Sequence, residues 1–283
     1  MLHKIIPNEC LSAFAYANIC DAILMRPDAY THGMTNTKIE IKNGSKLYVW
    51  GATINSIFKQ LKTSNVHDII LFSGDEDNSQ NSNGNKEQHI PPPNIIKWHA
   101  QNAEVNNNFI TPLPIGLCPP WARGVCNAKQ LQNVVLDIER NKLLYVNFIN
   151  VTNNFQRSEI YNVVYENTKE LKNCTFAEKY FHLKSEMIEY YANIQQHKFI
   201  LCPPGNGKDT HRVWESLYLG AIPIVEDSVM NRFFAQYFPM LLVDRWYDIN
   251  EDFLLKKYEE INKKTWRYDL LDCNNWLKEQ GIL

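Results

Sequence analysis

The sequence predicts an α/β protein with largely parallel sheets. Short apolar segments that favour β structure alternate with segments of helical periodicity along the 283-residue chain. Several apolar segments run directly into polar or Gly/Pro-rich stretches, as strands do where open α/β sheets bind ligands. The alternation occurs twice along the chain, which indicates two α/β domains with a cleft between them.

The first half begins with a segment that has the periodicity of an amphipathic helix over residues 1–25. A polar, turn-rich stretch follows at 26–46. The segment 109–117 is expected to be extended with broken pairing, because Pro112 and Pro114 lack the backbone donor that a central strand needs. The expected strands of this half are 46–50, 68–72 and 95–98, and its expected helix is 52–61.

The second half repeats the strand, polar turn and helix order. Residues 129–141 have a helical apolar pattern, and we place the domain junction there. The predicted domains are 1–138 and 139–264, followed by a C-terminal helical segment at 265–283. The expected strands are 143–148, 197–202, 221–225 and 240–243, and the expected helices are 156–167, 184–195, 211–219, 251–263 and 265–280.

Bulk composition argues against several classes of protein. The net charge of −2 gives no footprint for a polyanion, so nucleic acid is not an expected partner. Seven cysteines are scattered without a CxxC pair, which argues against a zinc site and favours a reduced intracellular chain. No apolar run is long enough for a signal peptide or a membrane span.

The strongest local signal is the strand, loop, helix and strand at 197–228. The loop is rich in Gly and Pro, and Asp209 or Thr210 is expected to cap the helix after it. Backbone N–H groups and the helix dipole at such a turn favour anions, phosphate above all. The loop residues expected to contribute are Gly205, Asn206, Gly207 and Thr210.

The helix after this loop carries His211, Arg212 and Glu215 within one turn, and the last two are three residues apart on one face. A cation for a diphosphate beside a carboxylate for ribose hydroxyls is what a nucleotide site requires. The strand at 143–148 leads into a second polar turn. The residues of that turn expected to face a ligand are Asn147, Thr152, Asn153 and Arg157.

Three segments resemble the exostosin-like glycosyltransferases, particularly short viral and bacterial members. They are FILCPPGNGKDTHRVWESLYLGAIPIV, which looks like the donor-binding signature, and WHAQNAEVNNNFITPLPIGL and LLYVNFINVTNNFQRSEIY. The resemblance implies the GT-B architecture, two Rossmann-like domains facing across a cleft. It also implies inverting, metal-independent transfer from a UDP-sugar bound by the carboxyl-terminal domain to a glycan bound by the amino-terminal domain.

The resemblance also bears on the C-terminal segment, the sugar and the compartment. In that family a final helix often crosses back to the first domain, which suits residues 265–283. Small members similar to this chain include xylosyltransferases of large algal viruses, so we favour UDP-xylose and leave UDP-galactose and UDP-N-acetylglucosamine open. Without an apparent amino-terminal anchor, a cytoplasmic enzyme is expected, in the host cytoplasm if the source is a virus.

The chemistry assigns roles to individual residues. The departing nucleoside diphosphate needs fixed positive charge, for which Arg212, matched by the family motif, is the first choice and Arg157 the second. Glu215 is expected to accept hydrogen bonds from ribose. Inversion needs a base for the acceptor hydroxyl, and Asp75 is the best candidate because it follows a buried strand in the acceptor domain. Asp77 and His99 are the alternative bases.

Two other functions remain open from the sequence. Asp75-Glu76-Asp77 has the DxD form of metal-dependent GT-A glycosyltransferases. Asn-rich loops and several tryptophans also suit a non-catalytic protein that binds nucleotide sugars or glycans. An ATP-binding P-loop is rejected, because Asp209 follows Lys208 where the motif requires Ser or Thr.

Overall fold

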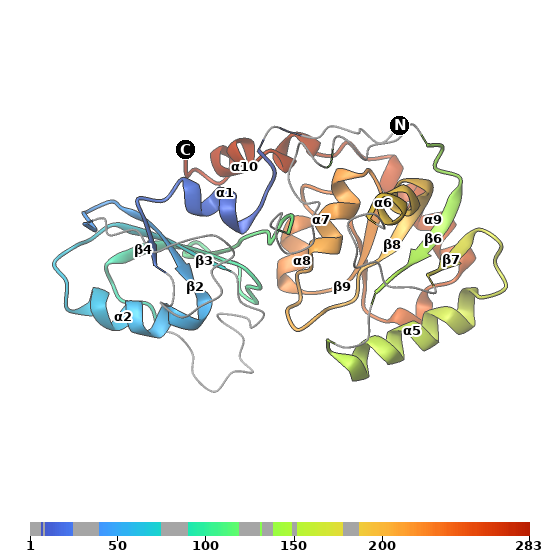
Figure 1. The fold of residues 1–283 in the computed structure, drawn as a ribbon, viewed down its shortest axis with the longest axis horizontal. Coiled ribbons are helices and arrows are strands. Elements are labelled where there is room, and N and C mark those ends of the chain that lie inside the picture. The colour runs from blue at the N-terminus through green and yellow to red at the C-terminus, as the bar shows by residue number, and fades with distance from the viewer. Residues whose placement is uncertain are drawn as a thin grey trace.

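A computed structural model describes residues 7, 9–24, 40–74, 90–118, 131, 138–148, 152–177 and 187–283. These residues form two five-stranded parallel sheets with helices packed against them (Figure 1). The predicted α/β class is therefore confirmed.

The first sheet has its strands in simple chain order, β1-β2-β3-β4-β5, with every pairing parallel. Two short helices cover it, and α1 and α2 lie on opposite faces (Figure 1). The strands are β1 (Ala22–Leu24), β2 (Lys46–Trp50), β3 (Ile69–Gly74), β4 (Ile95–Ala100) and β5 (Ile110–Pro112), and the helices are α1 (Ala13–Asn18), the 3₁₀ turn η1 (Gly51–Thr53) and α2 (Ile54–Lys62).

Helix α2 forms where the sequence places apolar side chains three and four positions apart. Ile54, Ile57, Phe58 and Leu61 are all buried against the sheet. Phe58 meets the ring of Trp98 edge to face at 5.5 Å. This contact fixes α2 against β4 and gives the first sheet a core of its own.

The second sheet has the strand order β10-β9-β8-β6-β7 and is also entirely parallel. Counted from its own first strand, this is the 2-1-3-4-5 order of flavodoxin-like folds, in which the direction of winding reverses between the first and third strands. Here that reversal falls between β6 and β8. The strands are β6 (Lys142–Val146), β7 (Cys174–Phe176), β8 (His197–Leu201), β9 (Ile222–Glu226) and β10 (Leu241–Val243).

Helices cover both faces of the second sheet. Apolar residues of α5 and α9 form one core with the sheet, and α6, α7, α8 and α10 pack into the core on the other face. The elements are α5 (Asn154–Thr168), α6 (Met187–Gln196), α7 (His211–Tyr218), α8 (Val229–Phe234), η2 (Trp246–Asp248), α9 (Glu251–Asn262), η3 (Tyr268–Leu271) and α10 (Cys273–Glu279).

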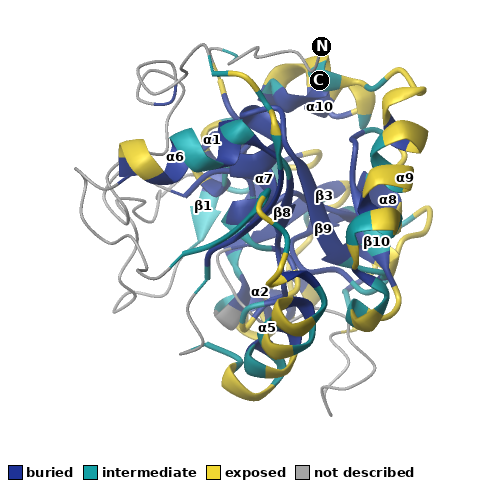
Figure 2. Ribbon diagram, turned by 90° about the vertical axis from the view of Figure 1, so that its right-hand side faces the viewer, coloured by how far each residue is buried: buried dark blue, intermediate teal, exposed yellow. Residues whose placement is uncertain are grey.

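One hydrophobic core runs through both halves of the molecule. It joins Tyr16 of α1 and Phe72 of β3 to Trp214 of α7 and Trp276 of α10. Figure 2 shows β3, β8 and β9 as buried, while α5 and α9 present exposed outer faces. Because the two sheets share this core, the relative position of their carboxyl ends is set by packing.

A segment near the start of the described chain lies beside one near its end. Cys10 and Asp272 form an antiparallel bridge, and the N–H of Cys273 donates to the Glu9 carbonyl at 2.8 Å. The Tyr218 hydroxyl accepts from the Leu11 N–H at 2.8 Å and donates to the Leu271 carbonyl at 2.6 Å. The last helix thus lies beside α1 (Figure 1).

Most predicted elements are present with ends shifted by no more than three residues, but two predictions were wrong and strand β7 was missed. Residues 1–25 were expected to be one helix, whereas the described part contains only α1 before β1 pairs with β2. Residues 265–280 were expected to be continuous helix, but Asp272 is an extended N-cap that separates η3 from α10. Strand β7 was not predicted, because its three residues are only half-buried and carry little pattern. The helix expected at 129–141 lies largely outside the described residues.

Candidate active site

The candidate site lies at the carboxyl ends of β6 and β8. These neighbouring strands flank the reversal of winding in the second sheet, and open α/β sheets bind ligands at that point. The turn after β6 leads into α5 with Arg157, and the loop after β8 leads into α7 with Arg212. The two turns predicted from the sequence are therefore neighbours.

The loop after β8 is stabilised from within. The N–H of Gly205 donates to the carbonyl of Gly207 at 2.9 Å. Asn206, between them, is exposed and Gly207 is buried. A Cβ atom at Gly205 would lie 3.2 Å from Nη2 of Arg157, so this glycine lets the guanidinium approach the loop.

Arg157 connects the two turns. Its Nε donates to the Pro204 carbonyl at 2.8 Å, and its Nη1 donates to the Thr152 hydroxyl at 2.7 Å. Its guanidinium carbon also lies 5.7 Å from the centre of the Phe148 ring. The side chain is buried, so it holds its charge in a fixed position.

The charges of Arg212 and Arg157 both act on the thiol of Cys202. Burial raises the pKa of the Cys202 thiol, at the end of β8, to about 12, and the charges of Arg212 and Arg157 oppose that rise. Arg212 is only 6% exposed. The Glu215 carboxylate acts on the same thiol with the opposite sign, but the two buried cations outnumber it, which favours an anion at this end of the strand.

Glu215 is held by α6. Its carboxylate accepts from the Tyr190 hydroxyl at 2.8 Å and from the Tyr191 hydroxyl at 3.3 Å, and it is 1% exposed. A carboxylate has about four acceptor sites, so two hydroxyl donors leave capacity for a diol such as ribose.

Asn147 joins this cluster through Tyr145. Its Nδ2 donates to the Tyr145 hydroxyl at 2.7 Å. Burial raises the pKa of Tyr145 to about 12, opposed by the hydrogen bond from Asn147 and by the charge of Arg212. Asn147 thus contacts a tyrosine on which the charge of Arg212 also acts.

Thr210 occupies the N-cap position of α7, but its side chain makes no capping hydrogen bond. Its hydroxyl oxygen is buried and has no hydrogen-bond partner in the structure, so the predicted capping role is wrong. A hydroxyl group at the start of the helix that carries Arg212 is thus available to a ligand.

Asp209, the other predicted cap, instead joins the two halves. Its carboxylate accepts from the Ile115 N–H at 2.8 Å and from Nε1 of Trp214 at 2.9 Å. Its own N–H donates to Oδ1 of Asn102 at 2.8 Å. Burial raises the pKa of Asp209 to about 7, against the effect of its N–H donors and of His211.

His211 also reaches across the junction, although it was predicted to face the donor. Its Nδ1 lies 2.8 Å from the Gly116 carbonyl and is placed to donate to it. Burial lowers the pKa of this imidazole, but the Cys118 side chain, the Gly116 carbonyl and the Glu215 charge outweigh burial and leave the pKa raised. Lys208 forms a further cross-junction ion pair with Glu104 at 3.0 Å.

The segments that resemble exostosin-like enzymes thus pack against each other. Asn102, Ile115 and Gly116 belong to the segment at 98–117, and all three contact Asp209 or His211 of the donor signature. As a result the carboxyl end of β4 meets the loop that follows β8.

The candidate bases have different outcomes. Asp75 and Asp77 lie outside the described residues. His99 lies in β4 and is 1% exposed, beside Phe72 at a ring distance of 5.1 Å. Burial, with a smaller contribution from Lys97, lowers its pKa to about 3, so the ring is neutral at physiological pH.

Sequence reasoning missed the supporting tyrosines. Tyr145, Tyr190 and Tyr191 hold Asn147 and Glu215, yet they occur within apolar patterns that predict core. A usable signal was the choice of tyrosine over phenylalanine at buried positions, since a buried hydroxyl needs a partner.

Among the described residues, no three His, Cys, Asp or Glu side chains are grouped as a metal site would require. Across the same part of the chain, each helix is too short or too polar to cross a lipid bilayer.

Comparison with known families places this site in context. Residues 126–278, more than half of the chain, match a family model described as RXYLT1 C-terminal domain. The matched range contains the whole second sheet, both turns of the site, and α10 except for its last residue, Glu279. No curated protein matched the sequence.

Proposed function

The chain belongs to the RXYLT1 C-terminal domain family, a glycosyltransferase family, and we propose that it transfers a sugar from a UDP-sugar to a glycan hydroxyl with inversion. The observation that carries the proposal is the position of Arg157 and Arg212 at the reversal of winding between β6 and β8. Such a site suits a nucleoside diphosphate. We take the two halves to be GT-B domains, with the donor in the second and the acceptor in the first.

The residues fit a diphosphate leaving group. As the glycosidic bond to the diphosphate breaks, negative charge develops on the departing oxygen, and prepositioned cations stabilise it. Arg212 and Arg157 supply that charge, and the unpartnered Thr210 hydroxyl supplies a donor beside it. Glu215 accepts hydrogen bonds from the ribose hydroxyls.

The acceptor hydroxyl loses its proton to a base in the first half. We propose Asp75, which follows β3 in the sequence. Asp75→Asn is expected to keep UDP binding, measured by calorimetry, and to abolish transfer. Normal turnover by this variant would remove Asp75 from the mechanism.

The donor test is hydrolysis of UDP-sugars without an acceptor. UDP-xylose, UDP-galactose, UDP-glucose and UDP-N-acetylglucosamine are compared by release of UDP. We expect UDP-xylose to be hydrolysed fastest, in accord with the resemblance to xylosyltransferases. If the protein binds UDP but hydrolyses none of the four and transfers none, a non-catalytic binding protein is the better description.

Metal dependence is tested in the same assay. We expect activity to persist in EDTA, since Arg157 and Arg212 supply the positive charge. Complete loss that manganese restores would favour the metal-dependent alternative through Asp75 and Asp77. The configuration of the product, read by NMR, tests inversion.

A further inference from the structure

A second group of polar side chains lies in the first half. His99 of β4 is 1% exposed, and neither ring nitrogen has a hydrogen-bond partner in the structure. The hydroxyl of Tyr16, on α1, is also buried without a hydrogen-bond partner. Each such group costs about 1–3 kcal/mol when it is left unsatisfied, so native proteins almost always supply a partner.

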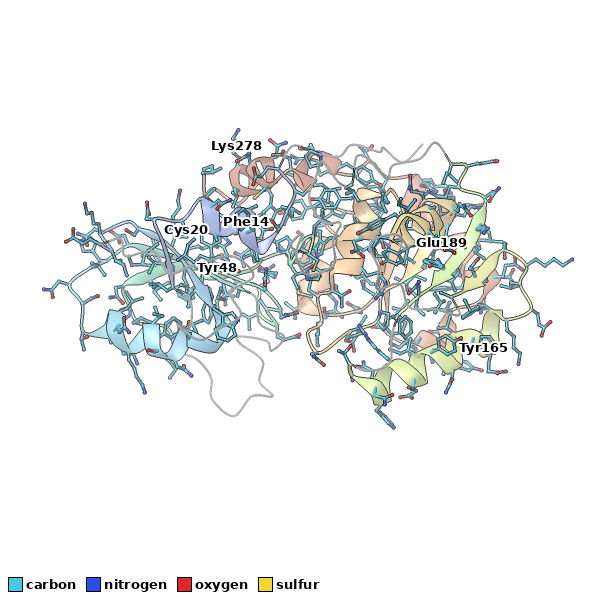
Figure 3. All side chains as sticks on the ribbon, viewed as in Figure 1. Phe14, Cys20, Tyr48, Tyr165, Glu189 and Lys278 are labelled. Carbon is cyan, nitrogen blue, oxygen red and sulfur yellow. The ribbon has the colours of Figure 1, made fainter. Side chains whose placement is uncertain are left out.

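His99 and Tyr16 belong to one surface on the α1 side of the first sheet, which we call the wall. Tyr48, Phe72, His99 and Thr111 are register partners in a row across the sheet, on one face. Phe72 stacks on His99 at 5.1 Å and on Tyr16 at 6.5 Å. Figure 3 shows Tyr48 of the same row in the layer between α1 and the sheet.

This wall is close to the junction with the donor half. His99 is the penultimate residue of β4, and three residues later Asn102 contacts Asp209. Burial raises the pKa of Tyr16, and the charges of Cys273, Asp209 and Tyr48 add to the rise. Tyr16 also shares one hydrophobic core with Trp214, whose Nε1 donates to Asp209, so the α1 side of the sheet faces the donor half.

The chemistry of the wall selects the ligand. His99 is neutral, so its ring offers one N–H donor and one nitrogen acceptor. The Tyr16 hydroxyl both donates and accepts, and neither group carries charge. Sugar hydroxyls match this pattern, whereas a phosphate would require a cation. Aromatic rings beside the polar atoms complete a surface of the kind that lines small-ligand sites.

We propose that His99 and Tyr16 form a subsite that hydrogen-bonds the hydroxyls of the acceptor pyranose; this inference rests on the proposed glycosyl transfer. Because both side chains are buried, the acceptor enters when α1, a helix of six residues, shifts away from β2 and β3, the strands that it contacts. The bound sugar then supplies the partners that both groups lack.

The experiment uses His99→Phe and Tyr16→Phe in the full chain. Each replacement keeps an aromatic ring and removes only the polar atoms. Acceptors are p-nitrophenyl glycosides of xylose, galactose, glucose and N-acetylglucosamine. We expect transfer at low acceptor concentration to fall by about tenfold or more, mainly through a higher acceptor KM. UDP affinity and acceptor-free hydrolysis should stay within about twofold of wild type.

Stability supplies a second readout. Removing an unsatisfied buried polar group should leave the thermal midpoint unchanged or raise it. Tyr268→Phe is the matched control, since its hydroxyl is also buried without a hydrogen-bond partner but lies near Arg140 in the other half. This control should share the stability effect and leave the acceptor KM unchanged.

Each outcome is decisive. If wild type hydrolyses UDP-sugars and both variants transfer normally, water alone satisfies these groups and the subsite is refuted. It is also refuted if wild type hydrolyses donor but accepts none of the four glycosides. If His99→Phe does not fold, Tyr16→Phe decides alone. If wild type neither binds nor hydrolyses any UDP-sugar, the proposed function itself fails.

Discussion

The two sheets of this molecule are alike in size and direction but differ in order. The first sheet is wound simply, β1 to β5 in sequence, whereas the second reverses between β6 and β8. At the reversal, the turns that follow these two strands leave a crevice, and side chains from both turns can point into it. Arg157 and Arg212 use that position, and the described strands of the first sheet provide no equivalent.

The difference in order corresponds to a difference in polar chemistry. The site of the second sheet carries charged side chains, and Arg157 and Glu215 have defined hydrogen-bond partners. The first sheet buries neutral polar side chains, of which His99 has no hydrogen-bond partner in the structure. Prepositioned charge suits a diphosphate donor, and neutral donors and acceptors suit a hydroxyl acceptor.

The largest expected effect tests whether the reaction needs the buried charge of Arg212, beside the second sheet. Arg212→Gln should lower kcat by about 10²–10³-fold, because a fixed donor to the leaving group is lost. Steady-state kinetics with the preferred UDP-sugar measures it, and the thermal midpoint reports on folding. Arg232→Gln is the matched control, since its exposed guanidinium pairs with Asp227 on the surface. Equal activity of the two variants would show that the reaction does not need the buried charge of Arg212.

The second test concerns how firmly the sheets are joined. Gly116 has φ +67°, and a Cβ there would lie 2.0 Å from the Leu11 carbonyl oxygen. Gly116→Ala should therefore destabilise the protein by about 3 kcal/mol or more, from backbone strain and overlap together. Gly44→Ala, at φ +79° with nothing within 4 Å, should cost only about 1 kcal/mol. Urea unfolding measures the loss of stability in both variants. Similar losses would show that the close contact between Gly116 and Leu11 adds nothing to the backbone strain at the glycine.

These two tests also separate what the sequence predicts from what it does not. Arg212 and Glu215 were found because their spacing and the preceding Gly-rich loop are local patterns. The roles of Asp209 and His211 were missed because their partners, Ile115 and Gly116, are about a hundred residues away. Strand order is likewise non-local, so the sequence predicted parallel strands but not the reversal between β6 and β8. The cap assigned to Asp209 failed because a tertiary partner competes with the local one.

The third prediction is a pH dependence of the junction. The pKa of Asp209 rises from 3.8 to about 7 on folding, and that of His211 also rises. A raised pKa stabilises the fold below the unfolded pKa, and this contribution is lost as pH rises through the folded pKa. The free energy of unfolding should therefore fall by about 2 kcal/mol between pH 5 and pH 8.

Substitution identifies the groups responsible for this slope. Asp209→Asn keeps one oxygen acceptor and removes the titration, so its stability should vary less over the same range in urea titrations. Asp227→Asn should leave the slope unchanged, because Arg232 lowers the pKa of Asp227 and so keeps its titration out of this pH range. A slope that survives in Asp209→Asn would assign the pH dependence elsewhere in the molecule.

The smallest expected effect concerns how Glu215 recognises the ribose of the donor. The Tyr190 hydroxyl donates to Glu215 at 2.8 Å and fixes the carboxylate that we assign to ribose. Tyr190→Phe should reduce the preference for UDP over 2′-deoxy-UDP by about three- to tenfold, the equivalent of one hydrogen bond. Competition binding with both nucleotides measures this preference.

Tyr165→Phe is the control, because that side chain is 38% exposed on α5 and stacks on Tyr161. An unchanged preference in Tyr190→Phe, with Glu215→Gln losing it, would mean that Tyr191 alone positions the carboxylate. An unchanged preference in both variants would remove Glu215 from ribose recognition.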